Sequence, residues 1–487
     1  MVWPLVSLAG PETLPPQHWA YAELEHFEAR GFLHLPGARP YSRTQVSGWV
    51  ETLQAHTADC APGERRRLAR LVAEFVDGDR AVERRDDPPL VNYAQAPWSV
   101  TGDLELRGGA VAAPGGGDPR TSWGRGRFET TLHYGEHVVY DTRYRVNVEA
   151  EGGARRGENR LSSRERNWHG LTSDNDRAYL ALEHGGLRVA FGRDFLGWGA
   201  RRNAELLVSD AGNSMDALGL RLRLGRFELS SVAAMLSASQ NRYYAAHRLD
   251  TDLGPVQLGV QEVAVFQGPH FDPTYLFPVS FYYGNQFNER ADDNVLLGAD
   301  VKWITRAGVL DAELMVDDFI YDGDPAPQKI GWRAGLTSAL PWAGRALELR
   351  AGYARLNRWT FTHRTTSAQY VAGTGDLRAG EPFLGTPLGP DADRAAATLA
   401  WTPGARGGLW WGVSTTRRGD GNRDLSPWIP GTPYALPFPS GSVRRTRALE
   451  AGGNLRFGKL ELQGAMALED EAGDRRGRIE TELRLDL

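Results

Sequence analysis

The side chains of this sequence that are best suited to chemistry are arginines, carboxylates and amides that occur close to tryptophan or tyrosine. The first group comprises Arg193, Asp194, Trp198, Arg201, Arg202 and Asn203. The others are Arg164, Arg166 and Trp168; Asn285, Asn288 and Arg290; and the aromatic residues Trp359, Trp428 and Tyr434. Guanidinium groups pair with carboxylates, amides hydrogen-bond to hydroxyls, and aromatic rings stack on flat apolar faces. These residue types indicate a binding surface for a sugar-like ligand.

Each group also has a structural interpretation. Acidic neighbours of the 164–168 segment, such as Glu158 and Glu165, predict a solvated loop of balanced charge. The arginines of the 193–203 segment could instead form ion pairs that stiffen a loop folded into the protein interior. The amides of residues 285–290 could cap turns. Residue type and spacing leave both interpretations open.

Catalytic patterns are weak in this chain. The adjacent carboxylates Asp292 and Asp293 would alternate faces on a strand, so they would not form an acid and base pair. Ser209-Asp210 lacks a nucleophile-elbow context, and none of the eleven histidines has HExxH spacing. Cys60 is the single cysteine, so we predict neither a disulfide nor a cysteine-based metal site. We expect no catalysis, metal or cofactor; a serine hydrolase in a barrel wall is the minor alternative.

Composition restricts the class of protein further. The formal net charge is -5 and the basic residues are scattered among acids, so we expect no nucleic-acid partner. No run of about 18 apolar residues occurs, which excludes an ordinary transmembrane helix. A closed β-barrel is the other structure that can cross a bilayer, because it leaves no backbone group unpaired in lipid. The apolar start, MVWPLVSLAG, fits either a signal-peptide remnant or a mature N-terminus.

The clearest strand pattern occupies residues 138–150. Apolar residues, including Tyr140 and Tyr144, alternate there with polar residues such as Asp141 and Arg143. A period of two places these two sets on opposite faces of a strand. The pattern fits two folds, a soluble antiparallel sandwich with one wet face or a transmembrane barrel with a polar interior.

Eighteen alternating segments follow one another from residue 98 to the end of the chain. Short turns alternate between them with mostly longer links, which is typical of outer-membrane barrels and would place both chain ends in the periplasm. We therefore predict an all-β transmembrane barrel of about 18 antiparallel strands. The segments are 98–107, 127–134, 138–150, 177–184, 187–194, 218–224, 227–239, 247–253, 256–266, 295–304, 309–317, 329–339, 346–357, 394–402, 409–418, 446–457, 460–470 and 478–487.

Residues 11–90 have helical rather than alternating periodicity. Three amphipathic helices are predicted, beginning after Pro15, at the capping-box residue Ser42 and at Pro62. So few helices make a small core, so we expect this N-terminal bundle to dock against the barrel of residues 98–487.

Three stretches of the sequence resemble the capsule assembly Wzi family of outer-membrane proteins. In FGRDFLGWGARRNAELLVSDAGNSMDAL, residues 191–218, the matching positions are Gly192, Arg193, Trp198, Gly199, Leu207 and Ser209. The others are PVSFYYGNQFNERADDNVLLGADVKW, residues 278–303, and FLGTPLGPDADR, residues 383–394. The N-terminal LPPQHWAYAELEHFEARGFL and RPYSRTQV are similar to the helical region that precedes the barrel in that family. Ala200 stands where the family's Trp-Gly-Pro-Gly turn has proline, which leaves the path of that loop open.

The resemblance implies an 18-stranded outer-membrane barrel with a periplasmic helical bundle. It implies a non-enzymatic protein that binds, anchors or helps assemble exported surface polysaccharide, with the first-named residues as candidate polysaccharide ligands. Polysaccharide and outer-membrane lipid are the expected partners, and a contact with periplasmic export machinery is left open. The alternative function is that of a porin, a diffusion channel for sugars or small anions.

Overall fold

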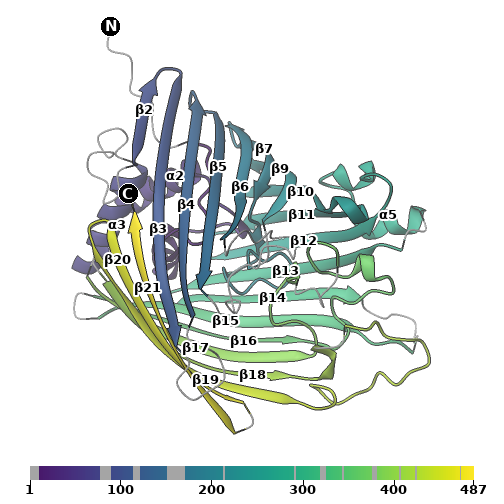
Figure 1. Cartoon of the computed structure of the whole chain (residues 1–487). Helices are drawn as coiled ribbons and strands as arrows, with labels where there is room; N and C mark the ends of the chain where they lie inside the picture. Colours follow the sequence, from purple (N-terminus) through teal and green to yellow (C-terminus); the bar gives the residue numbers. More distant parts are fainter. Residues whose placement is uncertain are drawn as a thin grey trace.

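The computed structural model confirms a closed antiparallel β-barrel. Eighteen strands, β3–β7 and β9–β21, follow one another around it, and β21 pairs with β3 to close the sheet (Figure 1). Closure removes the exposed sheet edges that a bilayer does not tolerate. The structure describes residues 10–76, 89–112, 121–150, 171–211, 214–289, 292–318, 325–342, 345–375, 381–404, 407–422, 425–471 and 473–486.

Each barrel strand overlaps one predicted segment: β5 and β7 have the predicted bounds, most others are longer than predicted, and β10, β11, β16 and β21 end one or two residues earlier. Their bounds are β3 Trp98–Ala112, β4 Thr121–Tyr134, β5 Val138–Ala150, β6 Leu171–His184, β7 Leu187–Asp194, β9 Met215–Leu224, β10 Phe227–Ser237, β11 Arg242–Asp252, β12 Val256–Gln267, β13 Asn294–Thr305, β14 Gly308–Asp318, β15 Lys329–Trp342, β16 Arg345–Leu356, β17 Ala392–Gly404, β18 Gly407–Arg418, β19 Arg444–Phe457, β20 Leu460–Glu471 and β21 Asp474–Asp486. Three short strands, β1 (Ala38–Arg39), β2 (Val91–Gln95) and β8 (Gly197–Trp198), complete the set. β2 forms a hairpin with β3, and β1 pairs with β8.

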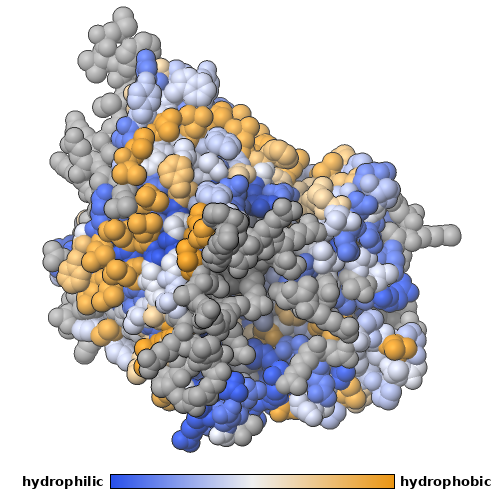
Figure 2. Space-filling model, viewed as in Figure 1, coloured by the Kyte–Doolittle hydropathy of each residue, from blue (hydrophilic) through white to orange (hydrophobic). Residues whose placement is uncertain are grey.

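The barrel wall has apolar side chains outside and charged side chains inside. On β5, Tyr140 and Tyr144 are 44% and 42% exposed, whereas Asp141 and Arg143 are each 1% exposed. Figure 2 shows apolar side chains gathered over the outer surface of part of this wall. A soluble sandwich would bury the tyrosines and expose the charges, so this polarity belongs to a barrel surrounded by lipid.

The connections sort to the two ends of the barrel largely as predicted. We call the end with turns such as Gly135–His137 and Gly185-Gly186 the short-turn end, and the opposite end the long-loop end. Two predicted long links are wrong. The 240–246 link is a tight turn because β11 starts at Arg242, and the 471–477 link is short because β21 starts at Asp474. Neither strand start alternates: β11 begins with aromatic and alanine residues on both faces, at residues 243–246, and β21 begins with charged residues on both faces, at residues 474–476.

The predicted helices are present in the N-terminal bundle, defined as residues 10–76. They are α1 (Ala20–Ala29), α2 (Arg43–Gln54) and α3 (Pro62–Phe75). The side-chain oxygens of Ser42 and Gln45 accept hydrogen bonds from each other's backbone amides, which confirms the capping box at the start of α2. Helices able to span a membrane are not found in the described part of the chain.

The N-terminal bundle is packed against the inner wall at the short-turn end. Ala29 of α1 lies in one apolar cluster with Ile304, Val309 and Ala339, which flank the turns of β13, β14 and β15. Polar contacts with strands around the barrel surround this cluster. They include Glu12–His133 (2.8 Å), Ser42–Glu183 (3.0 Å), Glu28–Lys302 (2.6 Å) and Glu25–Arg350 (2.8 Å). The bundle therefore contacts β4, β6, β13 and β16 and lies across this end of the barrel.

One buried carboxylate joins the helices of the bundle. Glu64 is fully buried and faces Nε2 of His26 at 3.1 Å and Nε of Arg30 at 2.9 Å, while the Ala61 amide donates to it at 2.8 Å. Burial by itself would raise the pKa of Glu64, but these partners outweigh it and lower the pKa to about 2. The folded bundle therefore favours the ionised carboxylate.

We predict that acid loosens the bundle before it disrupts the barrel wall. The folded pKa of Glu64, about 2, lies below the unfolded value of about 4.3, so its stabilisation is present above pH 4.3 and is lost as the pH falls towards 2. Hydrogen exchange, corrected for intrinsic rates, should show α1 and α3 losing protection in this range while β5 does not. Glu64→Gln should lower protection at neutral pH and shrink the acid-induced change. Glu51→Gln, at an exposed position of α2, is the matched control; equal behaviour of both variants would contradict the prediction.

Candidate functional site

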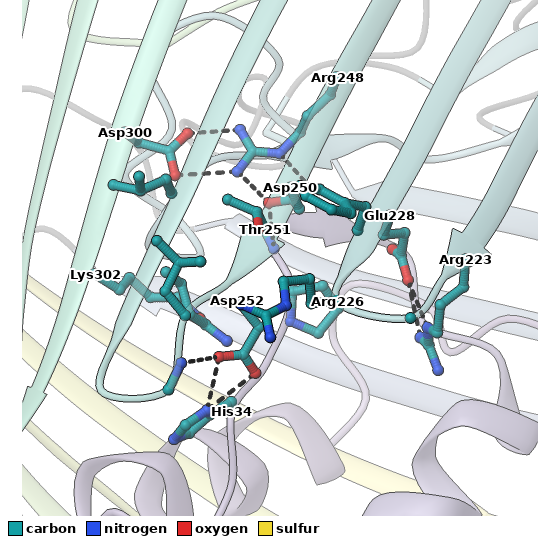
Figure 3. Close-up of a pocket in the computed structure, with 18 of the residues that line it drawn as sticks. His34, Arg223, Arg226, Glu228, Arg248, Asp250, Thr251, Asp252, Asp300 and Lys302 are labelled. Carbon is teal, nitrogen blue, oxygen red and sulfur yellow. Dashed lines mark hydrogen bonds and ion pairs between the residues drawn. The ribbon is translucent and has the colours of Figure 1, made fainter.

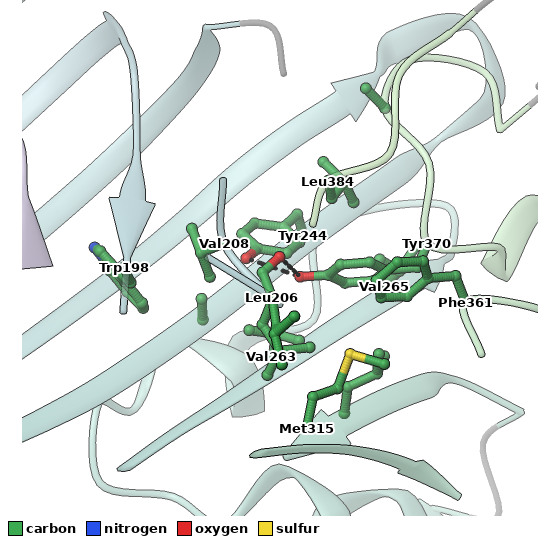
Figure 4. Packing of buried hydrophobic residues seen from close by; sticks show 14 of the residues in the cluster. Trp198, Leu206, Val208, Tyr244, Val263, Val265, Met315, Phe361, Tyr370 and Leu384 are labelled. Carbon is green, nitrogen blue, oxygen red and sulfur yellow. Dashed lines mark hydrogen bonds between the residues drawn. The ribbon is translucent and has the colours of Figure 1, made fainter. Parts of the chain in front are cut away.

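The link between β7 and β9, residues 195–214, is folded into the barrel. Leu206, Leu207 and Val208 are at most 1% exposed and pack against the inward side chains of β10–β14 (Figure 4). The inward positions in this part of the wall are apolar, among them Val263 and Val265, which are fully buried. An apolar core therefore fills the interior beside β10–β14, on the long-loop side of the barrel.

The described residues of the link between β16 and β17, residues 357–391, pack beside those of the 195–214 link. The Tyr370 hydroxyl donates to the Leu207 carbonyl at 3.0 Å. The Thr386 amide donates to the Leu206 carbonyl and the Ser209 amide to the Leu384 carbonyl, both at 3.0 Å. Two links that are far apart in the sequence are thus joined by backbone as well as side-chain hydrogen bonds. They form one plug inside the barrel.

Arg242 fixes the 357–391 link to the inner wall. This side chain at the start of β11 is fully buried, and its guanidinium donates to the carbonyls of Ser367 (2.5 Å), Gln369 (2.9 Å), Val371 (3.1 Å) and Gly373 (2.5 Å). The Arg242 guanidinium therefore supplies hydrogen-bond donors to four backbone carbonyls of the 357–391 link. The alternating pattern did not reveal this residue, because Arg242 lies in the stretch predicted to be a link.

The residues of the 193–203 segment are divided among different places. Arg193 is on the outer face of β7 and pairs with Asp216 at 2.5 Å, whereas Asp194 points inward and accepts from Thr13 at 2.6 Å. Trp198 is 1% exposed in the apolar core. Arg193, Asp194 and Trp198 therefore do not share one surface.

Arg201 and Arg202 lie between the plug and the N-terminal bundle. Arg201 donates to the carbonyls of Leu336 (2.6 Å) and Ala351 (3.1 Å). Arg202 donates to Glu25 at 2.9 Å and lies over the Tyr21 ring. Burial by itself would lower the pKa of Arg202, but the Glu25 carboxylate raises it above its usual value. These contacts agree with the structural interpretation of this segment; Asn203 is exposed, with φ of 61°.

The predicted 285–290 group belongs to the link between β12 and β13. The Asn285 side chain donates to Ser280 at 2.8 Å and to the Thr274 carbonyl at 3.4 Å, as expected for a residue that stabilises a turn. The side chain of Asn288 in α5 (Tyr282–Glu289) and the whole of Arg290 lie outside the described residues, as do Arg164, Arg166 and Trp168. The proposed roles of these five residues stay predictions.

Trp428 and Tyr434 form an aromatic pair in the link between β18 and β19, in which Trp428 is half-buried and Tyr434 is exposed. Their ring centroids are 6.2 Å apart and their planes are nearly perpendicular, at 89°. The Trp428 indole N–H donates to the Thr432 carbonyl at 3.1 Å, which orients the ring. Tyr434 is 41% exposed. This pair has the accessible faces that stacking on a sugar requires. Trp359 is also half-buried, but it lies beside Arg358 in the plug.

Asp391 joins the loop that carries this aromatic pair to the plug. It is fully buried and accepts from the amide (2.9 Å) and hydroxyl (2.6 Å) of Ser440 and from the Gly421 amide (2.9 Å). Phe438 of the same loop lies 3.7 Å below the Arg355 guanidinium. The backbone that carries Trp428 and Tyr434 is therefore anchored at both sides. Nothing in the sequence around Asp391 indicated this contact, because its partners come from a distant link.

A polar cavity of about 600 Å³ lies between the N-terminal bundle and the short-turn ends of β9–β13. Figure 3 shows the Arg248 guanidinium between Asp250 and Asp300, to which it donates at 2.6–3.0 Å. His34 of the bundle meets Asp252 at 3.0 Å. The Gly37 amide of the bundle also donates to Asp250 at 3.2 Å, so Asp250 and Asp252 bind the bundle, whereas Arg248 and Asp300 pair within the wall. A larger space, about 1030 Å³, lies against β16–β21, where Gly352, Ala396 and Ser414 line the wall.

The model of the family "Capsule assembly protein Wzi" matches residues 120–470, more than half of the chain. The chain belongs to this family. That family is named for capsule assembly and not for a catalytic activity, in agreement with the weak catalytic patterns of the sequence. No curated protein matches the chain.

Solved structures share the barrel fold. The Wzi outer-membrane protein of Escherichia coli, described as a carbohydrate-binding β-barrel involved in group 1 capsule assembly, superposes with a TM-score of 0.65 at 13% identity; the match covers 99% of this chain and 98% of that chain. Pseudomonas aeruginosa OprD has a TM-score of 0.46 at 8% identity and covers 80% of this chain and 95% of that one. At 13% identity the Escherichia coli structure supports the fold alone, and the TM-score of OprD is too low to support a conclusion.

We predict that Arg242→Gln releases the 366–375 part of the plug. Four buried carbonyls lose a charged donor, which should weaken this region by about 2–4 kcal/mol. Limited proteolysis or hydrogen exchange should then show opening of residues 366–375 increased by one to three orders of magnitude, with β11 unchanged. Arg364→Gln is the control, since that side chain is 78% exposed and its ion pair with Asp292 is worth at most about 1 kcal/mol. Equal opening in the two variants would show that Arg242 does not fix the plug.

Proposed function

We propose that this protein holds or helps assemble surface polysaccharide at the outer membrane by binding carbohydrate on its long-loop side. The observation that carries the proposal is the plugged interior: the N-terminal bundle lies across one end, and the 195–214 and 357–391 links form an apolar core behind the other. Where the interior is filled in this way, the loops of the long-loop side are the surface that we propose for the ligand. Family membership gives the class of ligand, and the Escherichia coli relative is described as carbohydrate-binding.

The long-loop end is proposed to face the cell exterior and the N-terminal bundle the periplasm. The support is the sorting of connections, since outer-membrane barrels place short turns in the periplasm and longer loops outside. Both described ends of the chain are at the short-turn end, as the even number of strands requires. In this orientation the Trp428–Tyr434 pair is available to polysaccharide on the cell surface.

The Trp428–Tyr434 pair is the proposed stacking platform for sugar rings. Its two rings are perpendicular, so they offer two faces in different directions, and the Asp391–Ser440 contact fixes their loop before a ligand arrives. A fixed platform loses little conformational entropy on binding. Flanking Ile429, which is 64% exposed, adds apolar surface without an aromatic face.

The pair gives a direct test of this function. Trp428→Ala and Tyr434→Ala should each weaken binding of purified capsular oligosaccharide about two- to tenfold, since aromatic contacts contribute about 0.5–1.5 kcal/mol and 1.4 kcal/mol is tenfold. Isothermal titration measures the affinity, and the fraction of polysaccharide released from cells measures retention. Ile429→Ala is the matched control. Unchanged affinity in the Trp428→Ala/Tyr434→Ala double variant would remove this pair from the site.

The porin alternative predicts different electrical behaviour. The inward arginines that suggested an anion channel are ion-paired, as in Arg143–Asp176 (2.7 Å) and Arg248–Asp300 (2.6 Å). We therefore expect the intact protein to show no stable open channel in planar bilayers. A steady, ohmic conductance in the intact protein would favour the diffusion channel instead.

A further inference from the structure

The described residues of the link between β12 and β13, 268–289 and 292–293, fold over the outside of the barrel. It contains a short 3-10 helix, η2 (Pro273–Leu276), and α5. Tyr275 and Tyr282 from these helices are 2% and 0% exposed, in a cluster with outward-facing residues of β11–β13 such as Phe266. Figure 1 shows α5 beside β11 and β12, at the opposite end of the barrel from α2 and α3. We call residues 273–289 the outer flap.

The outer flap covers polar side chains that point out of the barrel. Glu262 has the same orientation as the exposed Leu258 and Val260 of β12, yet it is 2% exposed. Its two carboxylate oxygens accept from the amides of Tyr282 and Tyr283, both at 2.7 Å, at the start of α5. His247 and Ser231 lie beside Glu262 in register on the neighbouring strands. Without the outer flap, a carboxylate, an imidazole and a hydroxyl would face outward together.

These polar residues lie within the height of the membrane. Trp303 is 53% exposed next to the short turn of β13 and pairs with Val256, which marks the lower edge of the apolar belt. Glu262 is six residues further along β12, or about 20 Å at 3.3 Å per residue. With a strand tilt of about 40°, this is about 15 Å above the Trp303 level, whereas the apolar band of such barrels is about 25 Å tall. A carboxylate facing lipid at that height would be costly, so the outer flap must remain in place in the bilayer.

Exposed apolar side chains are grouped in residues 276–281 of the outer flap. Phe277, Val279 and Phe281 are 66%, 77% and 58% exposed, and Leu276 is 45% exposed. Large apolar side chains grouped in this way on one segment mark an interaction surface. The lipid-facing positions of β12 lead up to the flap, since Leu258 and Val260, 40% and 53% exposed, precede the covered Glu262 on the same face of the strand.

We propose that the outer flap is inserted in the membrane and that Phe277, Val279 and Phe281 contact lipid acyl chains. Continuity with the lipid-facing wall and the height of Glu262 identify lipid as the occupant of this surface. The outer flap thereby covers Ser231, His247 and Glu262 and presents apolar side chains to lipid in their place. Assignment to the outer leaflet rests on the proposed orientation of the barrel, but insertion itself does not.

Site-specific quenching by brominated lipids tests this proposal in the intact protein. Single cysteines at Val279→Cys and Phe277→Cys carry a bimane label, and native Cys60, 3% exposed, gives the background in the unsubstituted protein. Leu314→Cys, at an outward position of β14, is the lipid-facing reference, and Ala435→Cys in the exposed β18–β19 link is the aqueous reference. Each variant is reconstituted in vesicles of phosphatidylcholine with or without bromine on its acyl chains.

We expect bimane at residues 277 and 279 to lose at least half as much emission in brominated vesicles as bimane at residue 314. Quenching no greater than at residue 435 would overturn the proposal. Efficient cross-linking of two Val279→Cys chains by a short bismaleimide, without quenching, would overturn it too, because a second copy of the chain would then cover the surface. Symmetric vesicles make the readout independent of barrel orientation and of polysaccharide binding, so the outcome does not depend on the proposed function.

Discussion

Buried charges on the inner wall control the organisation of this molecule. A barrel in lipid turns its polar side chains inward, and these charges must be paired because leaving one of them unpaired costs several kcal/mol. Some pairs join neighbouring strands, as Arg143 and Asp176 do, and others join the wall to the N-terminal bundle, as Lys302 and Glu28 do. The bundle is therefore part of the electrostatic balance of the barrel and not an appended domain.

The inward side chains of the wall are of two kinds, and each kind meets a different part of the chain. Near the short-turn end the inward positions are charged and meet the bundle, whereas on the long-loop side Val263, Val265 and Leu296 are fully buried and meet the 195–214 and 357–391 links. A charged plug and an apolar plug thus occupy successive levels of one interior. Because both are held by contacts from many strands, neither can leave the barrel without exposing charges or apolar side chains to water. A stable plug of this kind favours a loop surface, rather than the lumen, as the place where a ligand binds.

On the outer face of the barrel, polar side chains must be covered from lipid. Where β10–β12 carry Ser231, His247 and Glu262 outward, the chain folds the outer flap over them and caps the carboxylate with two amides of α5. Elsewhere on the described wall, side chains such as Leu314 and Trp332 face outward directly. The links of this barrel therefore have three separate tasks: residues 195–214 and 357–391 fill the interior, residues 268–293 cover the exterior, and residues 419–443 present the aromatic pair.

The sequence by itself determined the barrel, its 18 strands, the three helices of the bundle and the family, because alternation with a period of two, capping boxes and turn spacing are local properties of the chain. Charge in the alternating positions also predicted which face of each strand is polar. The site residues were less accessible to this reasoning. Arg193, Asp194, Trp198, Arg201 and Arg202 were grouped because they are close in sequence, yet the structure turns them to the outer face, the inner wall, the apolar core and the bundle. The tertiary structure decided two things: which way each link folds, and which groups Arg242, Glu262 and Asp391 bind. Those partners are more than a hundred positions away or on another link, so local sequence patterns do not reveal them.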